Sequence, residues 1–502
     1  MPISCPRILI AGTSGDSGKT VVSVGLGRTL SAQGRPVAAF KKGPDYIDAS
    51  WLSAASGRVA RNLDTFLTEP IAVRRSFIDN ALRTTPAEPG GVNLIEGNRG
   101  LHDGLDEEGT HSSAALSKLI QCPVILVQDV TKTTRSAAAF VLGSQQIDPD
   151  VNIAGVIVNR VAGARHEGVV RKAIEKYTGI PVVGAIPKLP AECRIQSRHL
   201  GLVTTREQTG IDDLIDRLAQ VVRDHVDIDR VLEIASAAPL LEEVGIRSDG
   251  ASGSPDGGGR RSRICYLSDT AFSFYYPENF EALEEAGAEL IPVSALDATT
   301  LPECDALYVG GGFPETQATA LAGNTTFRES VYSAAEGGLP IYAECGGLIY
   351  MARELVWNGE TFPMTGVFPV TIAIDRKPRG HGYARVLVDG KNPFFPEGLE
   401  LKGHEFHYSW LADAGPSADA GPSADAGASG RRIEDDSRTG LDAGASGRLR
   451  SVFKMQRGTG CGAGRDGLSR WNVLGTYLHV HALGCPAWAQ GVMRAAERYR
   501  KD

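Results

Sequence analysis

Short apolar runs alternate with amphipathic, helix-length stretches through the first half of the chain. Each run has the length of a buried strand, and together they are Arg7–Ala11, Val37–Phe40, Val92–Ile95, Val124–Val127, Ile153–Val158 and Val182–Ile186. Strands that are apolar on both faces and separated by helices are typical of a parallel sheet covered on both sides. The pattern therefore predicts an α/β domain with a mainly parallel sheet over residues 1–246.

A second α/β pattern appears after a change in composition. Residues 247–263 are rich in Gly, Ser and charge, which predicts a flexible linker. A second α/β domain is then expected over residues 264–502, from a helical pattern at Pro277–Ala286 and strand-like runs at Ile264–Leu267, Leu290–Pro292, Ala306–Val309 and Pro340–Ala343. Within it, residues 412–450 repeat ADAG-like units that cannot build a core, and we expect a low-complexity surface insertion there.

Composition agrees with a globular protein of two domains. The 502 residues exceed one ordinary core, since a domain holds roughly 100–200 residues. A formal net charge of -8 argues against a nucleic-acid partner. The eight cysteines are scattered, which argues against a metal-thiolate site or a disulfide framework. Because no apolar run approaches a membrane span and Met1–Arg7 lacks a signal-peptide pattern, we expect a cytoplasmic protein with no membrane contact.

A glycine-rich loop joins the first strand to the first helix. It reads GTSGDSGKT over residues 12–20, and the helical run Val21–Leu30 comes directly after it. Glycines allow backbone N–H groups to surround phosphates, Lys19 can reach the β and γ oxygens, and Thr20 can hold Mg²⁺. The loop is one residue longer than the usual phosphate-binding pattern, with Thr13 at the position of the first glycine. This junction predicts an ATP site.

Carboxylates lie after two other strands of the same domain. Asp45 and Asp48 lie in KKGPDYID just beyond the second strand, and a solvated turn is the alternative interpretation. Glu96 ends an apolar strand, and Asp103 lies a few residues later in the segment NRGLHDG. A carboxylate at a strand end can bind Mg²⁺ directly or through water, although a helix N-cap is the alternative for both residues.

The second domain carries a candidate nucleophile. A predicted strand leads into Cys345, and two glycines and a helical pattern at Leu348–Leu355 come after it. A thiol at such a turn is exposed near a helix N-terminus, which favours the thiolate. Upstream, Gly311 and Gly312 in GGGFPE come after another strand and can direct N–H groups at an oxyanion, unless they form a simple tight turn. A buried structural cysteine is the alternative for Cys345.

The base for this nucleophile should be a histidine that is distant in sequence. The histidines considered are His381, His404, His407, His479 and His481. His479 is preferred because it comes after the strand-like run Asn472–Leu478. His404 and His407 lie in an alternating aromatic segment that predicts a strand, so they are interpreted as substrate-facing or structural residues rather than metal ligands.

The motifs together resemble those of the cobyrinate a,c-diamide synthase family. They occur in one order and are AGTSGDSGKT, KKGPDYID, IEGNRGLHDG, VNRV, RHLGL, AFSFYYPENF, GGGFPE, AECGG, GHEFHYS and YLHVH. The resemblance implies a dethiobiotin-synthetase-like, P-loop ATP domain joined to a class I glutamine amidotransferase domain. It further implies a ligase of cobalamin biosynthesis that amidates the a and c carboxylates of a corrin through acyl phosphates, with ATP and glutamine as cosubstrates.

The resemblance also assigns roles to single residues. Gly15, Gly18, Lys19 and Thr20 would hold phosphate, Thr20 and Glu96 would hold Mg²⁺, and Asn159 in VNRV would contact adenine. Asp45, Asp48 and Asp103 would lie on the nucleotide and substrate side, whereas Cys345 and His479 would release ammonia. Many class I glutaminases have a glutamate two residues after the base, but this chain has His481 there. The resemblance leaves room for a homodimer.

Three alternative functions remain open. Trp51 and Arg99 differ from the commonest residues of the family, so a sirohydrochlorin or nickel-sirohydrochlorin type of tetrapyrrole is an alternative substrate. A cobyric acid synthase would amidate other side chains of a corrin. A ParA-like ATP switch would share the phosphate loop and sheet, but it would have no use for Cys345 and His479.

Overall fold

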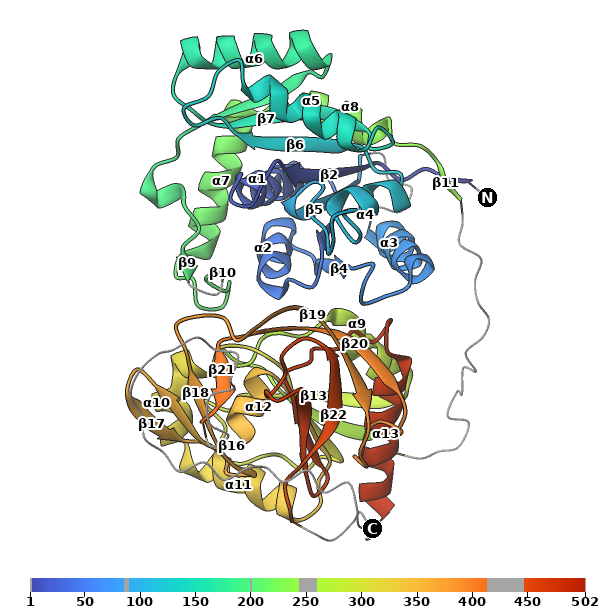
Figure 1. Ribbon diagram of the computed structural model, residues 1–502, viewed down its shortest axis with the longest axis vertical. Coiled ribbons are helices and arrows are strands. Elements are labelled where there is room, and N and C mark those ends of the chain that lie inside the picture. Colours follow the sequence, from blue (N-terminus) through green and yellow to red (C-terminus); the bar gives the residue numbers. More distant parts are fainter. Residues whose placement is uncertain (1, 85–89, 199–200, 243–259, 413–446, 502) are drawn as a thin grey trace. The chain divides into compact units, whose positions relative to one another are not determined.

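The computed structural model describes residues 2–84, 90–198, 201–242, 260–412 and 447–501. The chain divides into two compact units, Met1–Gly250 and Ala251–Asp502. Each unit is an α/β structure built around a sheet (Figure 1). Among the described residues, no helix has the length and apolar character needed to cross a membrane.

Unit 1 is built on a seven-stranded sheet in which all neighbouring strands are parallel, in the order β4-β3-β5-β2-β6-β7-β8. Its strands are β2 (Arg7–Gly12), β3 (Val37–Lys42), β4 (Arg61–Leu63), β5 (Val92–Gly100), β6 (Val124–Asp129), β7 (Ile153–Val161) and β8 (Val182–Pro187). Two short pairs lie outside it: β1 (Pro2–Ile3) with β11 (Leu241–Glu242), and β9 (Ser197–Arg198) with β10 (Gly201–Leu202).

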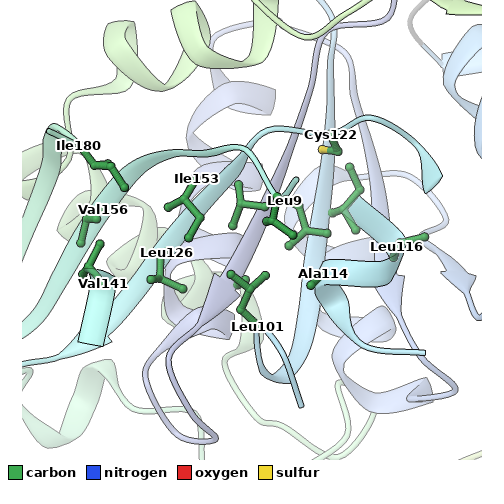
Figure 2. Packing of buried hydrophobic residues seen from close by; sticks show 14 of the residues in the cluster. Leu9, Leu101, Ala114, Leu116, Cys122, Leu126, Val141, Ile153, Val156 and Ile180 are labelled. Carbon is green, nitrogen blue, oxygen red and sulfur yellow. The ribbon is translucent and has the colours of Figure 1, made fainter. Parts of the chain in front are cut away.

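Helices pack on both faces of this sheet because successive strand residues point to opposite sides. In β2, Ile8 and Ile10 pack with α1, α7 and α8, whereas Leu9 and Ala11 belong to the cluster on the other face with α3 to α6 (Figure 2). The helices are α1 (Lys19–Ala32), α2 (Tyr46–Ser56), α3 (Pro70–Thr84), α4 (Ser113–Leu119), α5 (Ala137–Ile147), α6 (Ala164–Thr178), α7 (Ile211–His225) and α8 (Ile228–Ser236), with the 3-10 turn η1 (Ala191–Cys193).

Unit 2 contains a mixed nine-stranded sheet, in the order β13-β12-β14-β15-β24-β23-β22-β19-β20, and a four-stranded sheet, in the order β17-β16-β18-β21. The large sheet comprises β12 (Ser262–Leu267), β13 (Ala288–Val293), β14 (Ala306–Val309), β15 (Ile341–Glu344), β19 (Gly380–Val388), β20 (Glu400–His407), β22 (Arg450–Arg457), β23 (Arg465–Arg470) and β24 (Val473–Thr476). The small sheet comprises β16 (Ala352–Trp357), β17 (Glu360–Pro363), β18 (Phe368–Ile374) and β21 (Ser409–Leu411).

The large sheet of unit 2 is also covered on both faces. One face packs against α10 (Ala318–Gly323), α11 (Thr325–Glu336) and α12 (Gly346–Met351), and the other against α9 (Pro277–Glu285) and α13 (Pro486–Lys501). The 3-10 turn η2 (Pro314–Gln317) lies just after the Gly310–Gly312 segment. The first five strands of this sheet are parallel, so their carboxyl ends meet at one edge.

The expected α/β fold of both halves is confirmed, and each strand-like run overlaps an observed strand, although Pro340 precedes β15 and the run Asn472–Leu478 extends beyond β24 at both ends. The expected helix Leu348–Leu355 is wrong in its second half, because α12 ends at Met351 and the next residues pair with β17 and β18. The linker expected over 247–263 ends earlier, since β12 begins at Ser262, and its residues 247–259 lie outside the described residues. Most of the insertion, residues 413–446, also lies outside them, and β22 already begins at Arg450.

Candidate active sites

The phosphate loop of unit 1 connects β2 to α1, as expected. Gly18 is the N-cap of α1 with φ 104°, a conformation that favours glycine. A Cβ on Gly18 would lie 2.1 Å from Nδ2 of Asn159, which donates a hydrogen bond to the Ser17 carbonyl at 2.9 Å. Asn159 therefore braces the loop from β7. Gly15 lies at the exposed part of the loop, where its Cβ position has no atom within 4 Å.

Lys19 is the first residue of α1 and is only 7% exposed. Its Nζ donates a hydrogen bond to the carbonyl of Ser14 at 3.1 Å, so the side chain folds back over the loop. Burial, together with the neighbouring charge of Lys41, holds the pKa of Lys19 below its ordinary value, while Glu96 opposes this shift. A partly desolvated cation beside a glycine-rich loop at a helix start is suited to bind an anionic phosphoryl group.

Glu96 is fully buried and lies next to Thr20. The Thr20 hydroxyl donates to Glu96 Oε1 at 2.8 Å, whereas Glu96 Oε2 has no hydrogen-bond partner among the described residues. Burial raises the pKa of Glu96, and Lys41 opposes that shift. The carboxylate lies within β5, which continues to Gly100, so the expectation that Glu96 ends its strand is wrong. The extended backbone simply continues past the buried part of the strand.

This pair of side chains fits the expected Mg²⁺ site. A hard cation prefers oxygen ligands, and Mg²⁺ is usually held by one or two carboxylates together with phosphate and water. Glu96 Oε2 is a buried, unpaired oxygen beside a threonine hydroxyl, and an unpaired buried acceptor is costly unless a ligand satisfies it. Thr20 and Glu96 therefore offer oxygen donors of the kind that Mg²⁺ takes.

Lys41 is a member of this site to which the sequence motifs gave no role. Its buried Nζ contacts Asp48 Oδ2 at 2.5 Å, Glu96 Oε1 at 3.0 Å and the Gly97 carbonyl at 3.0 Å. Burial disfavours its charge, but Asp48 and Glu96 outweigh that effect, so the pKa of Lys41 is raised. The available signal was a lysine pair at the end of an otherwise apolar strand.

Asp45 and Asp48 both belong to the start of α2. Asp45 is the N-cap and accepts hydrogen bonds from the N–H groups of Ile47 and Asp48 at 2.8 and 3.0 Å. Desolvation and the nearby Asp48 raise the pKa of Asp45 to about 7. Since Asp48 also contacts Lys41, the segment is packed against the nucleotide site rather than forming an isolated solvated turn.

Asp103 is exposed, in the loop after β5. Its Oδ2 accepts a hydrogen bond from Gly100 N at 2.7 Å, and the neighbouring Leu101 N donates to the Gly12 carbonyl at 2.7 Å. The structure therefore holds this loop against the phosphate loop. The carboxylate of Asp103 closes a local turn, and its substrate-side role stays a prediction.

In unit 2, Cys345 lies at a strained turn between β15 and α12. Its backbone has φ 47° and ψ -96°, which is unusual for a residue with a side chain. The residue is only 7% exposed, so the expectation of an exposed thiol is wrong. Its N–H donates to the Thr476 carbonyl on β24 at 2.7 Å. Burial and the charge of Glu315 raise the pKa of the Cys345 thiol, so the helix start does not by itself produce the expected thiolate. A base is needed to remove the proton.

The Gly310–Gly312 segment after β14 approaches this turn closely. A Cβ on Gly346 would lie 2.9 Å from Gly312 N, and a Cβ on Gly311 would lie 2.5 Å from Cε1 of His479. Only residues without side chains permit these approaches. Gly310 N donates to the Tyr275 hydroxyl at 2.9 Å and is therefore already engaged. The arrangement brings Gly311, Gly312, Cys345 and His479 into one region, as expected for an oxyanion-binding segment.

His479 is buried and pairs with two elements. Its main chain exchanges hydrogen bonds with His404 of β20 at 2.9 and 3.2 Å, and the two imidazole rings stack with centroids 4.8 Å apart. Its Nδ1 lies 3.5 Å from Oε2 of Glu344. His404 is a strand residue as expected, and burial, together with His479, holds its pKa well below the ordinary value. Among the described residues no group of side chains suggests a metal site built on histidine and cysteine.

Two family models match the two units. A CobQ/CobB/MinD/ParA nucleotide binding domain matches residues 8–203, and a CobB/CobQ-like glutamine amidotransferase domain matches residues 263–486. The fold and the two sites therefore define a glutamine-dependent amidotransferase that carries a nucleotide-binding domain in the same chain.

Curated relatives cover the whole chain. It is 39% identical to a cobyrinate a,c-diamide synthase of Magnetococcus marinus, over 98% of both chains. It is 37% identical to one of Archaeoglobus fulgidus, over 99% of this chain and 98% of that one. The chain belongs to the cobyrinate a,c-diamide synthase family, and it is a glutamine-hydrolysing carbon–nitrogen ligase of cobalamin biosynthesis. Among solved structures, the chloroplast FtsY of Physcomitrella patens aligns with 43% of this chain and 65% of that one, at 16% identity and a TM-score of 0.29.

Proposed function

We propose that this ligase amidates the a and c side-chain carboxylates of a cobyrinate-type corrin through acyl phosphate intermediates. The observation that carries the proposal is the full-length identity of 39% to a curated relative named for that reaction. The presence of a phosphate loop and a cysteine–histidine site in one chain supports it, since the reaction needs both activation of a carboxylate and a source of ammonia.

The carboxylate is activated in unit 1. A substrate carboxylate oxygen attacks the γ-phosphorus of ATP, which gives an acyl phosphate and ADP. Lys19 and the loop N–H groups bind the phosphates and stabilise the charge on the transferring group. Thr20 and Glu96 would hold Mg²⁺, which neutralises phosphate charge when bound. Lys41, held by Asp48 and Glu96, adds a fixed positive charge beside them.

Three further assignments belong to this half-reaction. Asn159 contacts the adenine in this proposal, from an amide that also donates to the Ser17 carbonyl and accepts from Arg160 N. Asp45 and Asp48 lie on the nucleotide and substrate side through their contact with Lys41, and Asp103 does so through the loop that packs on Gly12. Gly15 offers its N–H to phosphate from the exposed part of the loop.

Ammonia is released in unit 2. His479 takes the Sγ proton of Cys345, and the thiolate attacks the glutamine carboxamide. The N–H groups of Gly311 and Gly312 stabilise the resulting oxyanion, and the protonated His479 passes its proton to the leaving ammonia. Water then hydrolyses the thioester to glutamate. Ammonia attacks the acyl phosphate, which releases phosphate and leaves the amide.

Product analysis tests the substrate. The purified enzyme, ATP and glutamine are incubated with cobyrinate, sirohydrochlorin and nickel-sirohydrochlorin, and mass spectrometry counts the hydroxyl groups replaced by amino groups. We expect two amidations of cobyrinate, located by fragmentation at the a and c side chains. Amidation at other corrin positions would favour a cobyric acid synthase, and preference for a sirohydrochlorin would replace the proposed substrate.

The metal assignment gives a second test. Glu96→Gln keeps the shape of the side chain but removes its negative charge, so we expect amidation to fall by about 10²-fold or more and to require a higher Mg²⁺ concentration. Amidation is measured over a Mg²⁺ series with ammonium as the nitrogen donor, which leaves unit 2 out of the reaction. Glu175→Gln, on the exposed part of α6, is the control. An unchanged Mg²⁺ dependence in Glu96→Gln would contradict the assignment.

A further inference from the structure

The base of the glutaminase site lacks the carboxylate usually found two residues after it. Position 481 is histidine, so the partner of the His479 imidazole must come from elsewhere. Among the residues that the structure describes, Glu344 brings a carboxylate within reach. It is the last residue of β15 and directly precedes Cys345. Its side chain is fully buried, and Oε2 lies 3.5 Å from His479 Nδ1.

Neighbours on both sides hold the Glu344 carboxylate in place. The hydroxyl of Tyr308, on the adjacent β14, donates to Oε2 at 3.2 Å, and Val480 N donates to Oε1 at 3.3 Å. Val480 is the residue next to His479, so the carboxylate is tied to the same segment as the base. The pairing of Glu344 with Thr476 joins β15 to β24 directly before this segment. A buried carboxylate fixed by two donors keeps one orientation.

The imidazole of His479 is oriented by its other neighbours as well. His404 stacks on the ring at an interplanar angle of 17°, and the Gly311 position lies close to the ring at Cε1. The two ring nitrogens flank Cε1, and with Nδ1 toward Glu344 the other nitrogen, Nε2, lies 3.4 Å from the Gly311 Cβ position. Nε2 is therefore the nitrogen that this arrangement assigns to accept the Cys345 proton.

We propose that Glu344 is the positioning residue of His479 and replaces the carboxylate usually found two residues after the base. This inference rests on the assignment of Cys345 and His479 to the glutaminase reaction. Glu344 accepts a hydrogen bond from the Nδ1–H group, which selects the tautomer protonated at Nδ1, and its negative charge stabilises the imidazolium formed when Cys345 is deprotonated. Because Glu344 directly precedes Cys345, its contact with His479 holds the base and the nucleophile together at the end of β15.

A second buried histidine–carboxylate pair nearby provides a matched control. His481 Nε2 lies 3.5 Å from Glu278 Oε2, the same separation as in the first pair. However, Leu483 N donates to His481 Nδ1 at 3.3 Å, and the ring packs on Tyr276 with centroids 4.6 Å apart. His481 therefore serves the local turn and the aromatic packing, whereas it is the ring of His479 that lies against the Gly311 segment.

The test compares Glu344→Gln, Glu344→Asp and Glu278→Gln in the full-length enzyme. Glutamate release from glutamine is measured across pH, and amidation with ammonium is measured in parallel. For Glu344→Gln we expect kcat to fall by about 10²–10⁴-fold with little change in KM. The acidic limb of the kcat/KM profile should move to lower pH, since the imidazolium loses its negative partner. Glu344→Asp should recover part of the rate, and Glu278→Gln should behave as the parent enzyme.

Several outcomes would overturn the inference. They are full glutaminase activity in Glu344→Gln, an equal loss in Glu278→Gln, or a loss in Glu344→Gln with an unshifted acidic limb. If thermal unfolding shows that Glu344→Gln is not folded, the test rests on Glu344→Asp. A reduced kcat with a retained acidic limb in Glu344→Asp supports the positioning role of Glu344, and an unchanged kcat refutes it. Cys345→Ser distinguishes failure of the glutaminase assignment from failure of the Glu344 proposal. If Cys345→Ser still uses glutamine, the glutaminase assignment is wrong. If Cys345→Ser is inactive with glutamine but Glu344→Gln is fully active, only the role of Glu344 is wrong.

Discussion

Cys345→Ser is expected to abolish glutamine-dependent amidation while amidation supplied with ammonium salt continues. Serine preserves the volume at the turn between β15 and α12, but its hydroxyl has a far higher pKa than a thiol, so the nucleophile is lost without a cavity. Because burial already raises the pKa of the Cys345 thiol, we do not expect the site to deprotonate a hydroxyl, which is a weaker acid than the thiol. We expect glutamate release to fall by about 10³-fold or more.

The measurement is product formation with each nitrogen donor, at equal ATP and substrate. Cys461→Ser is the matched control, because Cys461 is a free cysteine of the same unit that lies in the turn before β23. A Cys345→Ser enzyme that still used glutamine would contradict the nucleophile assignment. Loss of ammonium-driven turnover in a folded Cys345→Ser protein would contradict the separation of the two sites.

Lys19→Ala is expected to fail with glutamine and with ammonium alike. Lys19 is buried at the start of α1, with Nζ turned back over the phosphate loop, and its charge would contact phosphate in the transition state. Removing such a contact costs several kcal/mol, on the order of 10²-fold or more in rate. Loss of activity with both nitrogen donors would show that Lys19 acts in a step that does not depend on the source of ammonia.

ATP consumption and amide formation are measured with both donors, and thermal unfolding checks the fold. Lys172→Ala changes an exposed lysine on α6 and serves as the control for loss of a positive charge in the same unit. Near-normal amidation by Lys19→Ala would refute the ATP assignment. Loss only with glutamine would instead connect Lys19 to ammonia supply.

Much of the local structure could be predicted because apolar runs and glycine turns are local signals. The runs at Arg7–Ala11 and Pro340–Ala343 predict buried strands, and the glycine-rich loop and the Cys-Gly-Gly turn predict a junction from each strand to a helix. The helix expected to continue to Leu355 was overestimated, because periodicity does not reveal that Ala352–Trp357 has partners in β17 and β18. Pairing between distant segments overrides local preference there.

By itself, the sequence determined the α/β class, the phosphate loop with Lys19 and Thr20, and the candidates Cys345 and His479, since each depends on neighbouring residues. Only the tertiary structure decided which carboxylate meets each of these groups. Glu96 reaches Thr20 across β5 and α1, Lys41 joins it from β3, and Glu344 reaches His479 because β15 lies beside β24. These contacts join residues far apart in the chain, and strand order brings them together because parallel strands end at one edge of a sheet.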